Sequence, residues 1–284
     1  RLYPLSLLAL GLGLVVPIVG ALKGWEGGAL PEIGTIAVFS LFFLPAPPIY
    51  GFTGTHLYPF DSPAWSLFFE LVANFFYALV ARFLNWRVFA LILPVGAGLV
   101  AFTVMRHDTV GGPGWLWSHL DAGLARVLYC FFAGVAIYRL RERVKLPSIP
   151  AWAAAIALLV IFWVPAQGIW RPAFDAFAGI VLMPLLVMFA AGAMVKGVAA
   201  RVCASLGLLS YGVYVLHVPI KVLTEVALAT LNIELPSAMM EVALVAALAA
   251  TAAALADRFY DAPVRLWLTG RAKRKMPQLP TGEI

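Results

Sequence analysis

The chain has 284 residues, of which 63% are hydrophobic and 12% are charged. Soluble domains carry about 45–50% apolar and about 25% charged residues, so this composition excludes an ordinary soluble enzyme and predicts a protein that resides in lipid. The formal net charge of +6 comes from basic residues at the joints between apolar stretches and at the tail. This distribution indicates orientation in a bilayer rather than nucleic-acid binding.

The predicted elements are long apolar helices, because about 20 apolar residues span a bilayer core as a helix. The sequence therefore predicts an all-α polytopic membrane bundle of about eight spans, at residues 2–22, 64–84, 88–105, 123–140, 152–165, 174–195, 206–231 and 238–259. We expect one membrane domain at residues 1–268, followed by a basic cytoplasmic tail at 269–284 that is disordered and lies near anionic headgroups.

One further apolar stretch, residues 33–50, ends in Pro45, Pro47 and Pro48, which remove backbone donors. Charge decides how this stretch is interpreted, because Lys and Arg concentrate in cytoplasmic joints. Four basic joints, each separated from the next by two spans, can all be cytoplasmic: Arg82 and Arg87; Arg139 to Lys145; Lys196 and Arg201; and the tail from Arg265. Arg1 joins them only if residues 33–50 do not cross fully, so we expect that stretch to be re-entrant or interfacial on the outer side.

Two features concern the chain ends and the thiols. The chain opens at Arg1 without a Met, and we interpret it as a fragment whose N-terminus lies upstream. Residues 2–22 are long and lack a convincing cleavage pattern, which argues against a signal peptide. Cys130 and Cys203 lie inside and at the edge of apolar stretches, with no metal or redox spacing, so we interpret them as buried free thiols.

Polar residues inside spans are functional hypotheses, because they are costly to bury in lipid. The densest set lies in PAWSLFFELVANFFYAL, residues 63–79, where one helical face carries Ser66, Glu70, Asn74 and Tyr77, with Trp65 beside it. We expect Glu70 to face a cavity, pair with a cation or be protonated. The alternative is a structural carboxylate bonded to a neighbouring helix.

The second polar set lies in LGLLSYGVYVLHVPI, residues 206–220, where one face carries Tyr211, Tyr214 and His217, followed by Lys221. Pro219 leaves the Val215 carbonyl without its helical partner, which predicts a kink and local polarity near His217. His217 is a candidate proton carrier, ligand-binding group or packing group. The two tyrosines are candidates either for the site or for an aromatic belt.

These two strings resemble the most recognisable internal segments of the membrane acyltransferase-3 family, whose members acylate sugars of lipopolysaccharide, peptidoglycan and exopolysaccharide. The opening RLYPLSLLAL resembles the end of that family's arginine-containing cytoplasmic motif. The segment FYDAPVRLWL resembles the end of its last span, where an acidic residue, a Pro and an Arg recur. The similarity runs in order along nearly the whole chain.

The resemblance implies a fold of typically ten spans, so two would precede Arg1. In the family the first span carries a basic residue and a histidine regarded as catalytic, and neither lies in this chain. The resemblance therefore implies that residues 1–284 alone insert into the membrane but do not catalyse.

The resemblance also implies an O-acyltransferase that moves an acyl group, of acetyl type, from cytoplasmic acyl-CoA to a hydroxyl of a cell-surface or exported carbohydrate. The bacterial inner membrane would be its location, acyl-CoA its co-substrate, and no cofactor would be tightly bound. We expect Glu70 and His217 to be catalytic. The expected substrate-binding residues are Arg1, Trp65, Ser66, Asn74, Tyr77, Tyr211 and Tyr214. The inner basic joints can attract CoA phosphates, although positive-inside bias explains the same charges.

Two other classes stay open. A polytopic transporter would use Glu70 and His217 as an intramembrane proton relay. A structural membrane subunit would use neither for chemistry. Inverted repeats would favour the transporter, and none is visible in the sequence.

Overall fold

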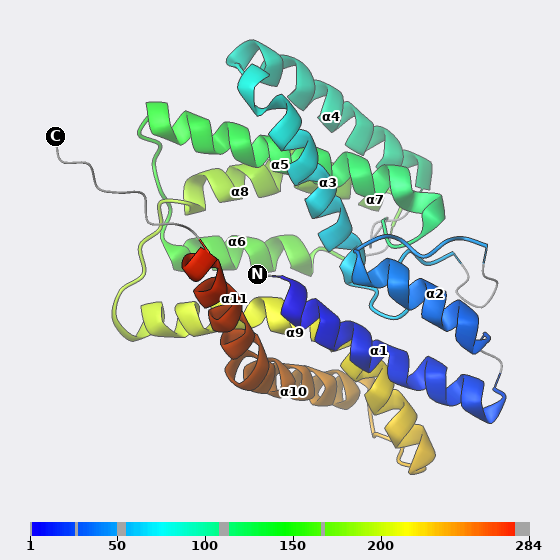
Figure 1. Ribbon diagram of the computed structural model, residues 1–284. Coiled ribbons are helices and arrows are strands. Elements are labelled where there is room, and N and C mark those ends of the chain that lie inside the picture. The colour runs from blue at the N-terminus through cyan, green and yellow to red at the C-terminus, as the bar shows by residue number, and fades with distance from the viewer. Residues whose placement is uncertain (1, 26–27, 50–54, 108–113, 166–167, 276–284) are drawn as a thin grey trace. The chain divides into compact units, whose positions relative to one another are not determined.

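The computed structural model describes residues 2–25, 28–49, 55–107, 114–165 and 168–275 (Figure 1). The chain is 79% helical, and within these ranges the sole extended pairing is an antiparallel bridge between His56 and Leu116. The predicted all-α class is confirmed. The helices divide between two compact units, one made of residues 1–42 and 202–284 and the other of residues 43–201.

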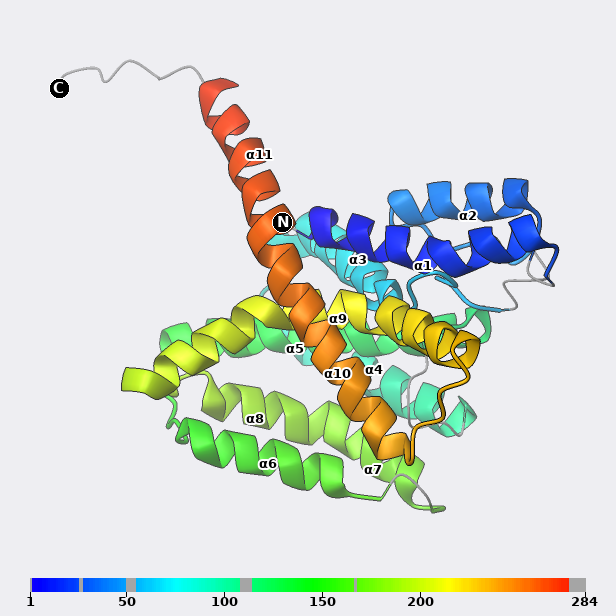
Figure 2. The ribbon, with the colours of Figure 1, turned by 90° about the horizontal axis from the view of Figure 1, so that it is seen from below.

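In the first unit, α1 (Tyr3–Lys23) and α2 (Leu30–Leu41) pack side by side (Figures 1 and 2). The Tyr3 hydroxyl donates a 3.0 Å hydrogen bond to the Leu41 carbonyl, which ties the start of α1 to the end of α2. Gly24 ends α1 in the left-handed region, with φ of 72°, where only glycine is unstrained. The two helices therefore form an antiparallel hairpin.

The same unit contains α9 (Gly197–Thr230) from residue 202 onward, and α10 (Ala238–Ala256). Small residues let these helices approach closely, since a Cβ added at Gly212 would lie 3.0 Å from the Ala253 Cβ. The Ser237 hydroxyl accepts a hydrogen bond from the Met240 N–H and so caps the start of α10.

A π-helical turn, Asp257–Asp261, follows α10 and leads into α11 (Ala262–Lys275). The Arg265 guanidinium lies 2.8 Å from the Asp261 carboxylate and 3.0 Å from that of Asp257. These ion pairs run along the helix and hold its turns together. Helix α11 continues to Lys275, past residue 269, where we expected a disordered tail to begin.

The second unit contains α3 (Ala64–Val80), α4 (Trp86–His107), α5 (Leu120–Arg143), α6 (Ala151–Trp163), α7 (Arg171–Phe177) and α8 (Met183–Ala190). Helix α4 packs along α5, and α6 lies beside α8 (Figure 2). A π-helical turn, Ala178–Leu182, joins α7 to α8. The Tyr129 hydroxyl of α5 donates to the Ile180 carbonyl at 2.7 Å and anchors this turn.

Loops between the helices of this unit pair with each other in what we call the loop layer, residues 43–49, 55–63 and 114–119. The Leu57 N–H donates to the Trp115 carbonyl, and the Trp117 N–H donates to the Thr55 carbonyl, both at 2.8 Å. The Trp117 indole also donates to the Ala46 carbonyl at 2.9 Å. These bonds join the three segments of the loop layer to one another; the side of the membrane on which they lie stays a prediction.

Arginines of the opposite joints cap helix ends. Arg139 donates to the Leu84 carbonyl beyond α3, and Arg141 donates to the Met188 carbonyl in the last turn of α8, at 2.6 Å. Terminal carbonyls lack intrahelical donors, so a nearby guanidinium satisfies them. The second basic joint therefore also has a structural role.

Seven helical segments in the described ranges are long and apolar enough to cross a membrane, where we expected about eight spans. The difference is α6, with 13 residues. Its length is ~20 Å at about 1.5 Å per residue, against a hydrocarbon core of about 30 Å. The expected span at residues 152–165 has nearly the same bounds, so the error lay in counting so short a stretch as a full span. The helix ends at Trp163, since Val164 precedes Pro165 and a residue before proline is disfavoured in the helical region. Helix α2, with 12 residues, is shorter still. The basic joints before α6 and after α8 are both cytoplasmic only if α6 crosses a locally thinned bilayer.

Both cysteines are exposed, so the prediction of buried thiols was wrong. The reason is that apolar side chains of a membrane protein need not be covered by protein. Large apolar side chains are widely exposed here, among them Phe162 (72%) and Trp163 (88%) of α6. Apolar surroundings therefore indicate lipid contact as readily as burial.

Candidate functional site

The polar face predicted on residues 63–79 lies on a single helix, α3. Glu70 is exposed, and no side-chain contact of its carboxylate occurs among the described residues. The Asn74 side-chain amide donates to the Glu70 backbone carbonyl at 2.8 Å, so it bonds within its own helix. The Ser66 hydroxyl likewise donates to the Pro63 carbonyl at 3.2 Å. Glu70 is therefore the group on this face whose charge remains available for chemistry.

Tyr77 and Trp65 lie in packed surroundings. The Tyr77 ring packs on Phe131, with 5.7 Å between ring centroids, and joins the apolar cluster around Phe89. The Trp65 ring meets Phe69 edge-on at 5.9 Å, and the Arg126 guanidinium lies 5.2 Å from the Trp65 centroid. A cation therefore already lies at the Trp65 ring, the ring that we expected to contact a sugar.

Tyr211 connects helices of the first unit. Its hydroxyl donates to the Leu2 carbonyl and lies 2.7 Å from the Ser6 hydroxyl of α1. This bonding accounts for a tyrosine inside an apolar helix by packing alone. Arg1, the other substrate-binding residue predicted at this end, lies outside the described residues.

The neutral His217 side chain is held in one tautomer. Its Nδ1 atom lies 2.6 Å from the Tyr214 backbone carbonyl. A carbonyl can only accept, so Nδ1 carries the proton and Nε2 carries the lone pair. The neutral ring therefore presents Nε2 as a base. The Tyr214 ring lies beside it, with 6.1 Å between centroids.

His217 lines a groove of about 340 Å³ between α9 and α10, which we call the His217 groove. Lys221 and Glu241 line it with His217, while the rest of the lining is apolar. The Lys221 ammonium pairs with the Glu225 carboxylate at 2.6 Å, one turn further along α9. Sequence analysis did not connect Glu241 with His217, because a contact between two helices leaves no spacing signal in the sequence.

A second polar site, which we call the polar cavity, lies in the second unit and was missed in the sequence. It has a volume of about 260 Å³ and is lined by residues of α4, α5, α6 and α7 together with the π-helical turn. Its ionisable lining includes Arg126, Arg171 and Asp175. Arg126 and Asp175 lie inside predicted spans. A charged residue inside a span is a functional candidate, so this signal was present in the sequence for both residues.

Asp61 is a buried carboxylate of the loop layer. It is 4% exposed, and its Oδ1 atom has no hydrogen-bond partner among the described residues. Burial raises the pKa of Asp61 to about 7. Burial also raises the pKa of the neighbouring Tyr58, whose hydroxyl donates to the Phe43 carbonyl at 2.6 Å. Burial therefore favours the neutral form of each group, and the pKa of Asp61 places its proton exchange near neutral pH.

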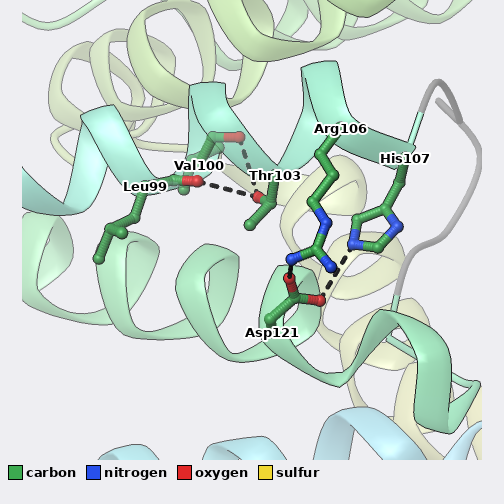
Figure 3. A network of polar contacts seen from close by, with 6 residues as sticks. All are labelled: Leu99, Val100, Thr103, Arg106, His107 and Asp121. Atoms are coloured by element: carbon green, nitrogen blue, oxygen red, sulfur yellow. Dashed lines mark hydrogen bonds and ion pairs between the residues drawn. The ribbon is translucent and has the colours of Figure 1, made fainter.

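The end of α4 is clamped to the start of α5 by charged groups (Figure 3). The Asp121 carboxylate accepts from Arg106 at 3.3 Å and lies 3.0 Å from His107 Nε2. Figure 3 also shows the Thr103 hydroxyl bonded to carbonyls of its own helix. The contacts of this network are internal, which indicates a structural clamp. Across the described ranges, no group of three or more His, Cys, Asp or Glu residues is placed to hold a metal ion.

A comparison with protein families distinguishes between the acyltransferase, the transporter and the structural subunit. A family model described as an acyltransferase domain, acyltransferase-3, matches residues 4–257. The chain belongs to the membrane acyltransferase-3 family. No curated protein and no solved structure matches it. The molecule is thus an integral membrane acyltransferase, with an acyl donor and an acyl acceptor.

The region matched to the acyltransferase-3 family includes both predicted catalytic residues. Glu70 belongs to the second unit and His217 to the first. That they act in one site stays a prediction, as do the substrate-binding roles of Trp65, Ser66 and Tyr214. Within its own unit, each catalytic candidate lies on a long apolar helix and carries a group suited to proton transfer or hydrogen bonding.

Proposed function

We propose that this acyltransferase transfers an acetyl-type acyl group from cytoplasmic acyl-CoA to a hydroxyl of a cell-surface or exported carbohydrate, in the bacterial inner membrane. Membership of the acyltransferase-3 family supports acyl transfer. The observation that favours a hydroxyl acceptor is the bond between His217 Nδ1 and the Tyr214 carbonyl, which leaves Nε2 as a base. Alcohol oxygens are weak nucleophiles and need such a base.

The reaction then proceeds by general-base catalysis. His217 Nε2 takes the proton of the acceptor hydroxyl while its oxygen attacks the thioester carbonyl carbon. The C–O bond forms, the C–S bond breaks, and the CoA thiolate leaves and recovers a proton from the imidazolium. The Lys221 ammonium, which lines the same groove, stabilises the negative charge that develops on the carbonyl oxygen. Glu70 accepts a hydrogen bond from the acceptor and orients it.

The donor approaches from the side of the basic joints. Arg139 and Arg141 are engaged with helix-end carbonyls. The cations left to attract CoA phosphates include Arg87 and Lys145, which are exposed. This attraction acts over distance and needs no built phosphate cradle.

The test uses the protein expressed from its complete reading frame, purified in lipid nanodiscs and supplied with acetyl-CoA and the host's envelope polysaccharide. We expect His217→Ala to lower acetyl transfer per folded protein about 10²–10⁴-fold, the usual contribution of a general base. His217→Gln, which keeps a hydrogen-bonding side chain but no base, should be as slow.

Thr224→Val is the matched control on α9. The Thr224 hydroxyl bonds to the Ile220 carbonyl of its own helix, so its loss should keep activity per folded molecule. A parallel loss of yield and activity in the His217 variants would instead assign His217 to packing. Transfer at the normal rate by His217→Gln would contradict the proposed base.

A further inference from the structure

An apolar groove that the proposed chemistry does not use lies between α3, α4 and α5, and we call it the α4 groove. Its volume is about 500 Å³, within the range of about 300–1,000 Å³ that small-molecule sites occupy. The lining side chains are apolar apart from the hydroxyl of Tyr129, and that hydroxyl donates to the Ile180 carbonyl. The groove therefore suits an apolar ligand.

The α4 groove has the depth of one membrane leaflet. Its wall on α4 extends from Val88 to Leu99, which is ~16 Å at about 1.5 Å per residue. Val88 lies two residues after Trp86, the start of this candidate span. Half of a hydrocarbon core of about 30 Å is ~15 Å. The groove thus follows the path of a lipid acyl chain from the membrane boundary to the middle of the bilayer.

The side chains of the groove favour a flexible chain over another helix. Membrane helices pack against each other through small residues. Large side chains such as Leu91 and Val95 line the groove and are exposed. Its small lining residues are Gly96 and Ala125, and the Tyr129 ring already packs on Gly96, where an added Cβ would lie 3.2 Å away. An acyl chain fits between large side chains where a helix backbone cannot approach.

One end of the α4 groove lies at basic residues. Leu84 and Val88 line this end. The Arg139 guanidinium donates to the Leu84 carbonyl, Arg87 directly precedes Val88, and Arg82 lies two residues before Leu84. The groove therefore opens beside three arginines that come from both sides of the α3–α4 and α5–α6 joints.

The charge at this end is strongly positive. Residues 81–87 and 139–145 hold six Lys or Arg residues and one acidic residue, Glu142, a net charge of 6 − 1 = +5. Arg82 and Arg87 are exposed. Within the described parts of the chain, none of the three arginines beside the groove forms an ion pair with a carboxylate. This end of the groove is thus complementary to an anionic group.

We propose that an anionic phospholipid binds here, with one acyl chain in the α4 groove and its phosphate at Arg82, Arg87 and Arg139. Guanidinium groups bind phosphate through charge-assisted hydrogen bonds, and basic pockets between membrane helices bind anionic headgroups. Positive-inside bias explains the charges alone, but not a groove of leaflet depth that ends at them. The attraction of CoA by Arg87 acts over distance, so it does not occupy this site.

The test uses the protein from its complete reading frame, purified in maltoside micelles and stripped of lipid. Native mass spectrometry gives the Kd of dioleoyl phosphatidylglycerol and of dioleoyl phosphatidylcholine. We expect one phosphatidylglycerol to bind at least about five-fold more tightly, since each arginine near an anionic headgroup contributes about that factor. Glycerol 3-phosphate and CoA should not displace it. Equal Kd values, no binding, or displacement by either soluble phosphate would overturn the proposal.

Charge variants test the headgroup end. Arg87→Gln should raise the Kd of phosphatidylglycerol about five-fold, and adding Arg82→Gln should raise it to about 25-fold. Neither change should affect phosphatidylcholine. Arg106→Gln is the matched control, because Arg106 carries the same charge at the opposite end of α4, where it pairs with Asp121. An equal effect of Arg106→Gln would show dependence on net charge alone and would overturn the headgroup site.

A bulky substitution tests the acyl-chain end. Leu91→Trp narrows the groove and should abolish one-to-one binding of phosphatidylglycerol. Leu79→Trp is the matched control, since Leu79 is also exposed but does not line the groove. Both positions are exposed, so folding should be kept in each variant. Unchanged binding in Leu91→Trp, or an equal loss in Leu79→Trp, would overturn the groove as the site of the chain.

Discussion

At the scale of single residues, Glu70 combines properties that rarely occur together in a membrane helix. It carries a carboxylate, it is exposed, and it stands within a candidate span. A carboxylate kept for packing would be bonded to a neighbouring helix, because an unsatisfied charge in lipid is costly. The described contacts of α3 show no such bond, so the catalytic role of Glu70 stays a prediction that mutation can test.

We therefore expect Glu70→Gln to lower acetyl transfer by at least about 10²-fold, because the amide is neutral and only one of its two terminal groups can accept a hydrogen bond. Membrane insertion and folded yield should stay normal. Initial rates with acetyl-CoA, per folded protein, measure the effect. Glu32→Gln is the control, since that carboxylate accepts from the Ala29 N–H and caps α2 locally. A normal rate in Glu70→Gln would assign Glu70 to structure.

Asp61 makes the stability of the loop layer depend on pH. The pKa of Asp61 is about 7 in the folded protein, against 3.8 in the unfolded chain. The folded state thus binds the proton more tightly than the unfolded chain. The contribution of Asp61 to stability is therefore greatest below about pH 4 and is lost as the pH rises to about 7. The full effect of such a shift is on the order of 4 kcal/mol.

The expected result is a higher melting temperature at pH 5 than at pH 8 in detergent micelles, and a smaller difference in Asp61→Asn. Asp121→Asn serves as the control, because Asp121 is partly exposed and paired with Arg106 and His107. An equal pH effect in wild type and Asp61→Asn would show that other groups cause it.

At the scale of helices, close packing around two glycines holds the loop layer against α5. A Cβ at Gly123 would lie 2.7 Å from the Phe69 ring and 2.8 Å from the Gly114 Cα. Gly114 itself has φ of +134°, a conformation that L side chains rarely adopt. The loop therefore approaches α5 at a point where neither partner has room for a side chain.

We expect Gly123→Ala to destabilise the protein by about 1–3 kcal/mol, the usual cost of overpacking. Gly134→Ala on the same helix is the matched control, since nothing lies within 4 Å of its added Cβ. Its greater helix propensity should make it neutral or slightly stabilising. Melting temperatures in one detergent compare the two variants. Equal values would mean that the loop shifts at little cost.

The helix boundaries show which features of the fold the hydrophobic pattern of the sequence can predict. Hydrophobic length predicted the positions of α1, α3, α4, α5 and α10, because each is a long apolar stretch between polar joints. It also predicted the position of α6, but counted this 13-residue helix as a full span. The last predicted span ends at residue 259, whereas helical structure continues through α11 to Lys275. Hydrophobic length carries no signal for the polar end of that helix.

At the scale of the whole molecule, the sequence predicted which helices carry polar residues but not how those residues meet. Helical spacing placed His217 and Lys221 on one face, and the His217 groove contains both. The same reasoning could not bring Glu241 to them, or Arg126 to Arg171, since those contacts join helices that are distant in sequence. Contacts of that kind depend on tertiary packing, which leaves no period in the chain.

Orientation in the membrane is the remaining prediction at this scale. In a background without Cys130 and Cys203, we expect cysteines at Thr55 and Asn232 to react with an impermeant maleimide from outside the cell. Cysteines at Lys145 and Lys196 should react only after permeabilisation, because basic joints stay cytoplasmic. Protection of Thr55 with labelling of Asn232 would mean that residues 33–50 cross the bilayer.

The short α6 has a consequence for the membrane itself. A helix ~10 Å shorter than the hydrocarbon core, at about 1.5 Å per residue, creates hydrophobic mismatch, and lipids beside it adapt by thinning. Ile161 and Phe162, near the end of this helix, line the polar cavity. A dip in the bilayer at that point would bring the water boundary to the charged cavity.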